Sequence, residues 1–379
     1  MTTYPNGQQA TFQYDQENRL TGTASGTTAG YLYTEAPTGI KTGATELSGR
    51  SVQWSFDGIY LLTGETVAND PAKVNGSVAY TLDPVGNRLT ESSSLQGIDS
   101  GSFSYNADDE LTGEMYDADG NVTATGGKTF TYDSQNELVS MNGGAVSLVY
   151  DGDGNRVAET ASGVTTRYLV DDLNPTGYAQ VVEETVNGAP QREYTYGLQR
   201  IDEDQIVNNA WTVSYYGYDG FGTVRQLTNA AGAVTDTYEY DAFGNEITST
   251  GSTPNEMLYR GEQYDSTLGL YYLRARYYNP ATGRFMSRDP LNGNIRIPAT
   301  LHKYLYADTD PVNVEDPSGQ GLFDRIVAGI LAVGLFTASP EEQAVLPHVE
   351  IETEAIFQQA EQVLEEVIGG SAPPPPPPQ

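Results

Sequence analysis

A short unit recurs along the first 250 residues, and it limits the fold more than any other feature of the sequence. Each copy has an aromatic residue, a skipped position, an aromatic residue or Leu, and then Asp or Asn. Two or three turn formers and an apolar residue follow. Alternation with period two is typical of a β-strand. The copies are "FQYDQENRLTG" (12–22), "YTLDPVGNRLTE" (80–91), "FSYNADDELTGE" (103–114), "FTYDSQNELVS" (130–140), "VYDGDGNRVAE" (149–159), "YGYDGFGTVRQL" (216–227) and "YEYDAFGNEITS" (238–249).

The residues after each Asp favour chain reversal. Asp-Gly, Gly-Asn and Asn-Arg supply positive φ and side-chain bonds to the backbone, so each unit predicts a hairpin. Equivalent tyrosines, such as Tyr105, Tyr132 and Tyr150, recur about every 18 to 27 residues, a spacing at which units bury their apolar faces by stacking on neighbours. We therefore predict an all-β spiral of antiparallel hairpins over residues 1–250, with almost no helix.

One copy also resembles a calcium loop, because Asp151, Asp153 and Asn155 alternate with glycines. An EF-hand loop needs a bidentate carboxylate at its twelfth position. Counted from Asp151, that position is Ser162, and in the related stretch "YDADGNVTATGGK" it is Lys128. The stretch predicts an acidic turn with no metal, and weak calcium binding is the alternative.

Composition excludes several kinds of chemistry. With 51 acidic and 19 basic residues, a formal charge of −32 opposes binding to nucleic acid or anionic membranes. The absence of cysteine excludes disulfides and thiolate chemistry, and two histidines, His302 and His348, exclude a histidine-rich zinc site. No nucleotide-binding motif is present, so we predict no cofactor and no metal. Any chemistry must use carboxylates, supported by Arg, Lys or Tyr.

Tyrosine is abundant, with 27 residues against 10 phenylalanines. A tyrosine can bury its ring and keep its hydroxyl in water. This preference predicts a thin sheet that solvent reaches from both faces.

The rest of the chain changes character twice. Residues 251–320 are rich in aromatics and hold arginines, as in "YRGEQYDSTLGLYYLRARYYNPATGRFMSRDP". In residues 321–379, the apolar run Ile326–Phe336 is shorter than the roughly 18 residues of a membrane span, which predicts a buried or partner-packed helix. Ile351–Ile368 has one apolar stripe and predicts a second helix, before the polyproline end "APPPPPPQ". We expect three domains with these boundaries.

These residues resemble the Rhs/YD-repeat family, which includes bacterial Rhs toxins, the C subunits of insecticidal Tc toxins and the teneurins. The specific part is 259–319, which ends in "LHKYLYADTDPVNVEDPSG" and looks like the Rhs-associated core. The resemblance implies a hollow β-shell, closed at one end by the core, that holds a variable toxic C-terminal domain. The array here is too short for a full shell, so we expect a partial wall.

The resemblance also implies an aspartate-dependent self-cleavage site. Its residues would be Asp289 of the first Asp-Pro motif, Asp316 of the closing one, and Arg276 of "RYY". Two close carboxylates share a proton, so one can activate a water and the other protonate the leaving amide, while an arginine orients them. The expected cut lies between Gln320 and Leu322, beside Gly321.

Two departures from the family and one alternative accompany this site. The Asp289–Asp316 interval is longer than usual in toxin members, and Gln320 replaces the usual Leu before the cut. The alternative is that Asp316-Pro317-Ser318-Gly319 is a turn and nothing more.

The functional prediction is an encapsulation and self-processing module of a polymorphic toxin. The alternative is an extracellular adhesion module that binds glycan or protein through a tyrosine-rich face. An independent hydrolase would need two carboxylates set in a cleft, and no other pair stands out. Expected partners are the chain's own C-terminal segment or upstream shell repeats, with secretion machinery or a cell-surface receptor as further candidates. No signal peptide opens the chain, so we expect secretion or surface display as part of a longer protein.

Overall fold

The computed structural model describes residues 1–293 and 298–321, and strands dominate both ranges. A ten-stranded and a fourteen-stranded sheet form a wall, and a four-stranded sheet belongs to the core. Strands follow sequence order in every sheet, and neighbours pair antiparallel. The predicted all-β array of consecutive hairpins is confirmed.

The first sheet contains β1 (Thr2–Thr3), β2 (Gln9–Tyr14), β3 (Leu20–Ser25), β4 (Ala29–Glu35), β5 (Lys41–Glu46), β6 (Ser51–Phe56), β7 (Leu62–Ala68), β8 (Gly76–Leu82), β9 (Arg88–Ser93) and β10 (Gly101–Ser102). The second contains β11 (Met115–Tyr116), β12 (Val122–Thr125), β13 (Lys128–Tyr132), β14 (Leu138–Met141), β15 (Val146–Tyr150), β16 (Arg156–Ala161), β17 (Val164–Asp171), β18 (Gln180–Val186), β19 (Ala189–Tyr196), β20 (Arg200–Val207), β21 (Ala210–Tyr218), β22 (Val224–Thr228), β23 (Val234–Tyr240) and β24 (Glu246–Thr250). The third contains β25 (Gln263–Asp265), β26 (Leu270–Leu273), β27 (Arg276–Asn279) and β28 (Arg284–Phe285), with short 3-10 turns at Tyr259–Gly261, Pro298–Leu301 and Ala307–Thr309.

The aromatic residue before each turn Asp sits at an irregularity of the ladder. The register shifts just before Tyr14, Tyr132, Tyr150, Tyr218 and Tyr240. A bulge of this kind bends its strand and increases the local twist. Repeated at unit after unit, these bulges curve the wall.

The Asp of each unit then holds its own turn closed. Asp151 Oδ1 accepts hydrogen bonds from the backbone N–H groups of Asp153 and Asn155, both at 2.9 Å, and Oδ2 accepts one from Asn155 Nδ2 at 3.1 Å. Asp117 and Asp241 bond in the same way. Within residues 1–293 and 298–321, no group of three or more acidic or histidine side chains could hold a metal ion.

Asp151→Ala is expected to lower the free energy of unfolding by about 1–2 kcal/mol, because two backbone N–H groups lose a charged acceptor. Chemical denaturation measures the change. Asp153→Ala is the control, since its side chain is exposed, and it should cost less than about 0.5 kcal/mol. Equal losses in the two variants would contradict this account of the turn.

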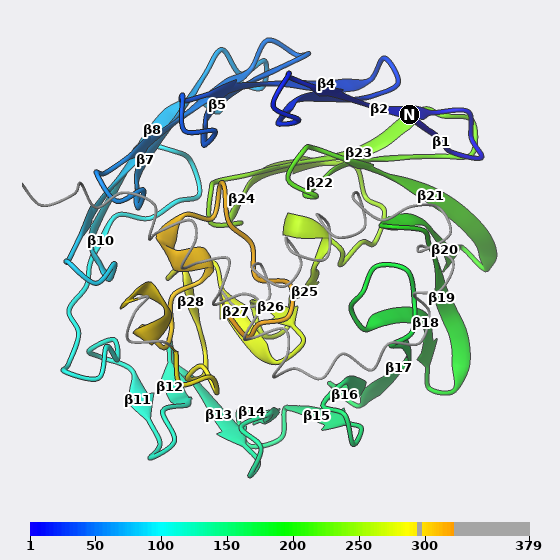
Figure 1. Ribbon diagram of the computed structural model, residues 1–379. Helices are drawn as coiled ribbons and strands as arrows, with labels where there is room; N and C mark the ends of the chain where they lie inside the picture. Colours follow the sequence, from blue (N-terminus) through cyan, green and yellow to red (C-terminus); the bar gives the residue numbers. More distant parts are fainter. Residues whose placement is uncertain (294–297, 322–379) are drawn as a thin grey trace, which may run out of the picture. The chain divides into compact units, whose positions relative to one another are not determined.

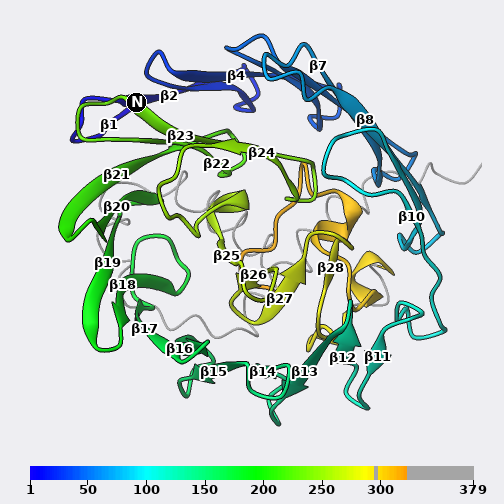
Figure 2. The same cartoon turned by 180° about the vertical axis from the view of Figure 1, so that it is seen from behind.

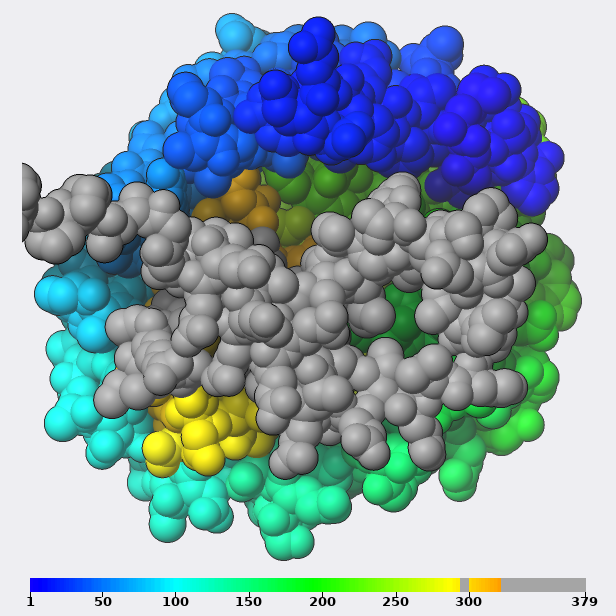
Figure 3. Space-filling view, viewed as in Figure 1, coloured from blue at the N-terminus to red at the C-terminus, as the bar shows by residue number. Residues whose placement is uncertain are grey.

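The beginning of the wall lies against its end. Asn6 Nδ2 donates to Thr228 Oγ1 at 3.0 Å, and Gln8 Nε2 donates to the carbonyl of Gly232 at 2.7 Å. Further along, Arg225 Nη2 lies 2.9 Å from Glu46 Oε1. The strands thus make one circuit around β25–β28 (Figures 1 and 2), and their order can be followed from blue through cyan to green around the face in Figure 3.

The core joins the wall through aromatic side chains. Tyr216 and Leu227 of the wall share a buried cluster with Tyr271, Tyr278 and Phe285 of the core. Burying so much aromatic area is a large stabilising term. The core sheet is therefore held inside the curved wall by side chains that are almost completely buried.

The tyrosine hydroxyls of this cluster differ from the sequence-based expectation. Tyr259, Tyr271 and Tyr278 donate to the backbone carbonyls of Ala242, Gly244 and Phe243 at 2.8, 3.1 and 2.7 Å. The prediction of hydroxyls in water is wrong for these residues, because a single wall turn supplies their acceptors in the interior.

The predicted helices at Ile326–Phe336 and Ile351–Ile368 lie outside the described residues. Among the residues that are described, no helix is long and apolar enough to cross a membrane.

Candidate functional site

The three residues of the predicted site come from separate parts of the core. Arg276 opens β27, a strand whose first three residues are all buried. Asp289 lies beyond β28, and its backbone N–H donates to the carbonyl of Lys303 at 2.9 Å. Asp316 begins the Asp-Pro-Ser-Gly turn, in which the N–H of Gly319 donates to its carbonyl at 3.3 Å.

The structure brings these three side chains together at one arginine nitrogen. Arg276 Nη2 lies 3.2 Å from Asp289 Oδ2 and 3.3 Å from Asp316 Oδ2. The guanidinium also stacks on the ring of Phe285, with its carbon 3.6 Å from the ring centroid. Two carboxylates thus share one buried cation, an arrangement in which charge-assisted hydrogen bonds fix both acids.

Burial changes the acid–base properties of this group. It raises the pKa of Asp289, while Arg276 acts in the opposite direction. It also lowers the pKa of Arg276, and the two carboxylates oppose that effect. A carboxylate with a raised pKa is a stronger base than one in water, which suits it to proton transfer.

The residues of the expected cut lie beside both acids. Asp316 Oδ1 accepts a hydrogen bond from the N–H of Gln320 at 3.1 Å, and Oδ2 accepts one from the N–H of Gly321 at 2.8 Å. A Cβ added to Gly321 would lie 2.8 Å from Asp289 Oδ2, and the φ of Gly321 is +90°. The positive φ therefore favours glycine at residue 321, and a side chain there would also require the Asp289 carboxylate to shift.

Two contributors to this site were missed in the sequence. Lys303 offers its carbonyl to Arg276 Nη1 at 3.3 Å, which no sequence pattern signals. Ser318 Oγ donates to Asp316 Oδ1 at 3.2 Å and lies 3.1 Å from the N–H of Gln320. Serine two residues after Asp in a tight turn is a signal that could have indicated this bond.

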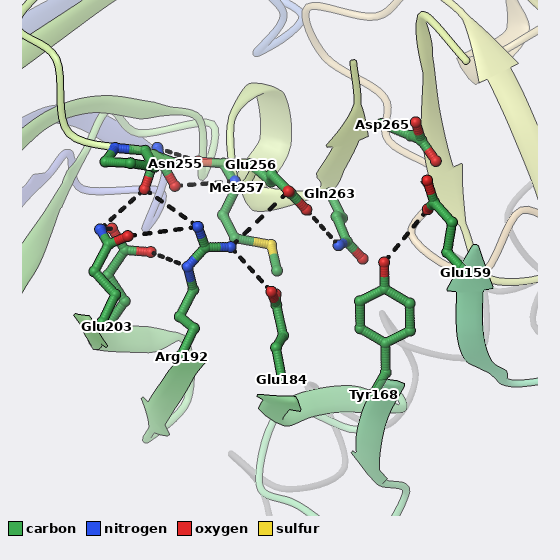
Figure 4. Close-up of polar contacts among 12 residues, drawn as sticks. Glu159, Tyr168, Glu184, Arg192, Glu203, Asn255, Glu256, Met257, Gln263 and Asp265 are labelled. Atoms are coloured by element: carbon green, nitrogen blue, oxygen red, sulfur yellow. Dashed lines mark hydrogen bonds and ion pairs between the residues drawn. The ribbon is translucent and has the colours of Figure 1, made fainter. Parts of the chain in front are cut away.

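A second group of acids and arginines lies where the wall meets the core, and Figure 4 shows the contacts around Arg192. Arg192 Nη1 lies 3.1 Å from Glu184, and its Nε lies 3.6 Å from Glu203. Arg156 Nη1 lies 3.2 Å from Asp265 and 3.4 Å from Glu159. Carboxylates outnumber arginines here, and burial without a full set of cations favours the neutral form of an acid.

Burial raises the pKa of Glu159 to about 8, with the neighbouring charge of Asp265 adding to the effect. Burial also raises the pKa of Glu203 to about 7, against the pull of Arg192. The pKa of each carboxyl is therefore higher in the folded chain than in the unfolded one. Their contribution to stability is complete below the unfolded value of about 4.3 and is lost as the pH rises through about 7 to 8.

The melting temperature is therefore expected to be higher at mildly acidic pH than at mildly alkaline pH. Glu159→Gln should flatten this dependence, because the amide does not ionise. Glu193→Gln is the control, since Glu193 is exposed on the same sheet and its change removes the same charge. Identical pH profiles for the two variants would show that Glu159 is not responsible.

Comparison with known proteins places most of these residues in one family. The family model described as "Teneurin YD-shell" matches residues 73–312. That range contains the whole second wall sheet and most of the core, including Arg276 and Asp289.

Bacterial relatives match much of the same region. The tRNA3(Ser)-specific nuclease WapA of Bacillus spizizenii is 31% identical over 273 residues, which is 67% of this chain and 11% of the relative. The double-stranded DNA deaminase toxin A of Burkholderia cenocepacia is 28% identical over 262 residues, which is 59% of this chain and 17% of the relative. The chain thus spans a small part of the length of these proteins.

Solved structures share the fold. The crystal structure of TcdB2-TccC3 has a TM-score of 0.68 at 20% identity and covers 84% of this chain and 19% of that one. The Tc holotoxin pore of Photorhabdus luminescens also gives 0.68, at 18% identity, and covers 84% of this chain and 18% of that one.

Proposed function

Because the chain belongs to the teneurin YD-shell family, among the Rhs/YD-repeat proteins, we propose that it is the shell and self-processing module of a bacterial polymorphic toxin. The relatives support a carrier role. A tRNA nuclease and a DNA deaminase toxin, whose named activities differ, both match this module. A part shared by toxins of unlike chemistry is better suited to holding a toxic domain than to being one.

The partner of the module is then its own C-terminal segment, together with upstream repeats of a longer chain. The single circuit of the wall around the core supports this role (Figure 1). The alternative of adhesion through a tyrosine-rich face has less support, because many tyrosines are buried. Tyr14 and Tyr60 are two that are widely exposed, at 59% and 46%.

The proposed reaction is hydrolysis of the peptide bond between Gln320 and Gly321. One observation carries it: the N–H groups of Gln320 and Gly321 bond to Asp316, while Asp289 lies beside Gly321. The nitrogen of Gly321, which would leave, is thus 2.8 Å from a carboxylate oxygen. Such placement of the reacting groups supplies much of the rate in intramolecular reactions.

In this reaction the two acids hold one proton between them. Asp289, ionised, removes a proton from water, whose oxygen adds to the carbonyl carbon of Gln320. After water has added and the nitrogen of Gly321 has become tetrahedral, Asp316 takes up a proton from the shared pair and delivers it to the lone pair of that nitrogen, and the carbon–nitrogen bond breaks. Arg276 is the positioning residue that orients both carboxylates.

Intact-mass spectrometry of the purified full chain tests the proposal. The expected result is a fragment that ends at Gln320 and its complement that begins at Gly321. A chain that stays whole through long incubation would contradict self-processing and leave the carrier role as the remaining function.

A further inference from the structure

A pocket of about 460 Å³ lies where two wall turns face the core, and we call it the side pocket. On the wall, it is lined by Gln135–Leu138, from the turn after β13 to the first residue of β14, and by Gly152–Asn155 between β15 and β16. On the core, its lining includes Arg276, Ser318 and Gln320. These core residues are the ones that bond to the proposed catalytic acids or precede the proposed cut.

The acids themselves are almost closed to solvent. The side chains of Asp289 and Asp316 are 11% and 3% exposed. The side pocket is lined by residues that bond directly to the two carboxylates: Arg276 bonds to both, and Ser318 and the N–H of Gln320 bond to Asp316.

The side pocket is also suited to hold water. Glu137, Asp153, Asn136 and Asn155 bring polar atoms to it, and Gln135, Gly152 and Asp153 are exposed at its outer side. A water needs about 30 Å³ and two to four polar partners, so a volume of this size holds many molecules in contact with solvent.

We propose that the side pocket supplies the water for self-cleavage, and that the wall turns 135–138 and 152–155 are therefore part of the reaction site. The inference rests on the proposed function. Hydrolysis consumes one water for each bond, adding its oxygen to the carbonyl carbon of Gln320 and its two protons to the products. The wall thus controls access to a reaction whose acids all come from the core.

Filling the side pocket tests this inference. Gly152 has no atom within 4 Å of an added Cβ, and its φ lies outside the left-handed region. Gly152→Trp therefore adds a large apolar side chain at the pocket with little backbone strain. We expect the rate of self-cleavage of the full chain, followed by intact mass, to fall by about tenfold or more, as expected when access of a reactant is blocked.

Gly58→Trp is the matched control. Gly58 follows Asp57 as Gly152 follows Asp151, and Asp57 Oδ1 accepts the same pair of backbone N–H bonds, from Ile59 and Leu61. Its added Cβ also meets nothing within 4 Å, and its φ is likewise outside the left-handed region. This variant should cleave at the wild-type rate.

The outcomes separate the two proposals. A wild-type chain that is never cut overturns self-processing itself. A wild-type chain that is cut, with Gly152→Trp cut equally fast, overturns the role of the side pocket. Gln135→Trp, which fills the same pocket from the other turn, replaces Gly152→Trp if circular dichroism shows that the first variant does not fold.

Discussion

Asp316→Asn is expected to leave the chain whole under conditions in which the wild-type chain is cut. The amide oxygen can accept only one of the N–H bonds of Gln320 and Gly321, because these two groups donate to different oxygens of Asp316. The backbone bond from the N–H of Gly319 to the carbonyl of residue 316 does not need the carboxylate, so the turn is retained. The amide cannot donate the carboxyl proton to the leaving nitrogen, and it removes the negative charge that pairs with Arg276. Loss of a positioned acid typically slows a reaction by about 100- to 10,000-fold, which intact-mass spectrometry over time would register as no fragment.

Asp289→Asn should have the same effect, because it removes the proposed base. Asp310→Asn is the control for both changes. Asp310 also precedes a proline in the core and is 6% exposed, but its Oδ1 accepts from the N–H of Asn313 in another turn. This variant should be cut at the wild-type rate. Cleavage of Asp316→Asn at a rate near wild type would exclude the carboxyl of Asp316 from the reaction.

Arg156→Met is expected to lower the free energy of unfolding by about 3–5 kcal/mol, the cost of removing one partner from a buried ion pair. Arg156 is among the largest fully buried side chains. Its Nη2 donates to Gln263 Oε1 at 2.7 Å, and its Nη1 donates to Tyr277 Oη at 3.0 Å and to Asp265 Oδ2 at 3.2 Å. The methionine fills the space of the stem but leaves three polar groups of the core without this partner.

Chemical denaturation measures this loss, with Arg167→Met as the control. Arg167 is exposed on the neighbouring strand β17, so its replacement should change stability by less than about 0.5 kcal/mol. A loss below about 1 kcal/mol for Arg156→Met would be too small for a buried pair and would show that the wall does not anchor the core through this residue.

The hairpins of the wall could be predicted from the sequence because their causes are local. Alternating residues before Asp151 define a strand, and the side chain of Asp151 closes the turn that follows. The ladder shift before Tyr150 could not be predicted, since it depends on how two strands pair across the turn. For the same reason, the curvature of the wall that follows from such shifts could not be predicted from the sequence.

The contacts that close the circuit of the wall could also not be predicted from the sequence. Glu46 and Arg225 lie far apart in the chain, and nothing local marks them as partners. The same is true of the tyrosine hydroxyls, because the composition shows how many there are but not which carbonyls accept from them. Here tertiary packing decides where the polar end of each side chain goes.

The candidate site was predicted from resemblance rather than from the residues alone. Asp-Pro pairs are common in turns, so Asp289 and Asp316 carry little signal by themselves. That both meet Arg276 is a result of how the core folds. The side pocket could not have been predicted at all, because its wall turns and its core residues come from different sheets.

The most direct measurement of self-processing is the mass of the product made in labelled water. The full chain, synthesised by cell-free translation in water enriched in heavy oxygen, should yield a fragment ending at Gln320 whose new carboxyl group carries one heavy oxygen atom. The same synthesis of Asp316→Asn should yield the whole chain. A wild-type chain that remains whole, or a fragment that ends at a residue other than Gln320, would contradict the proposed reaction.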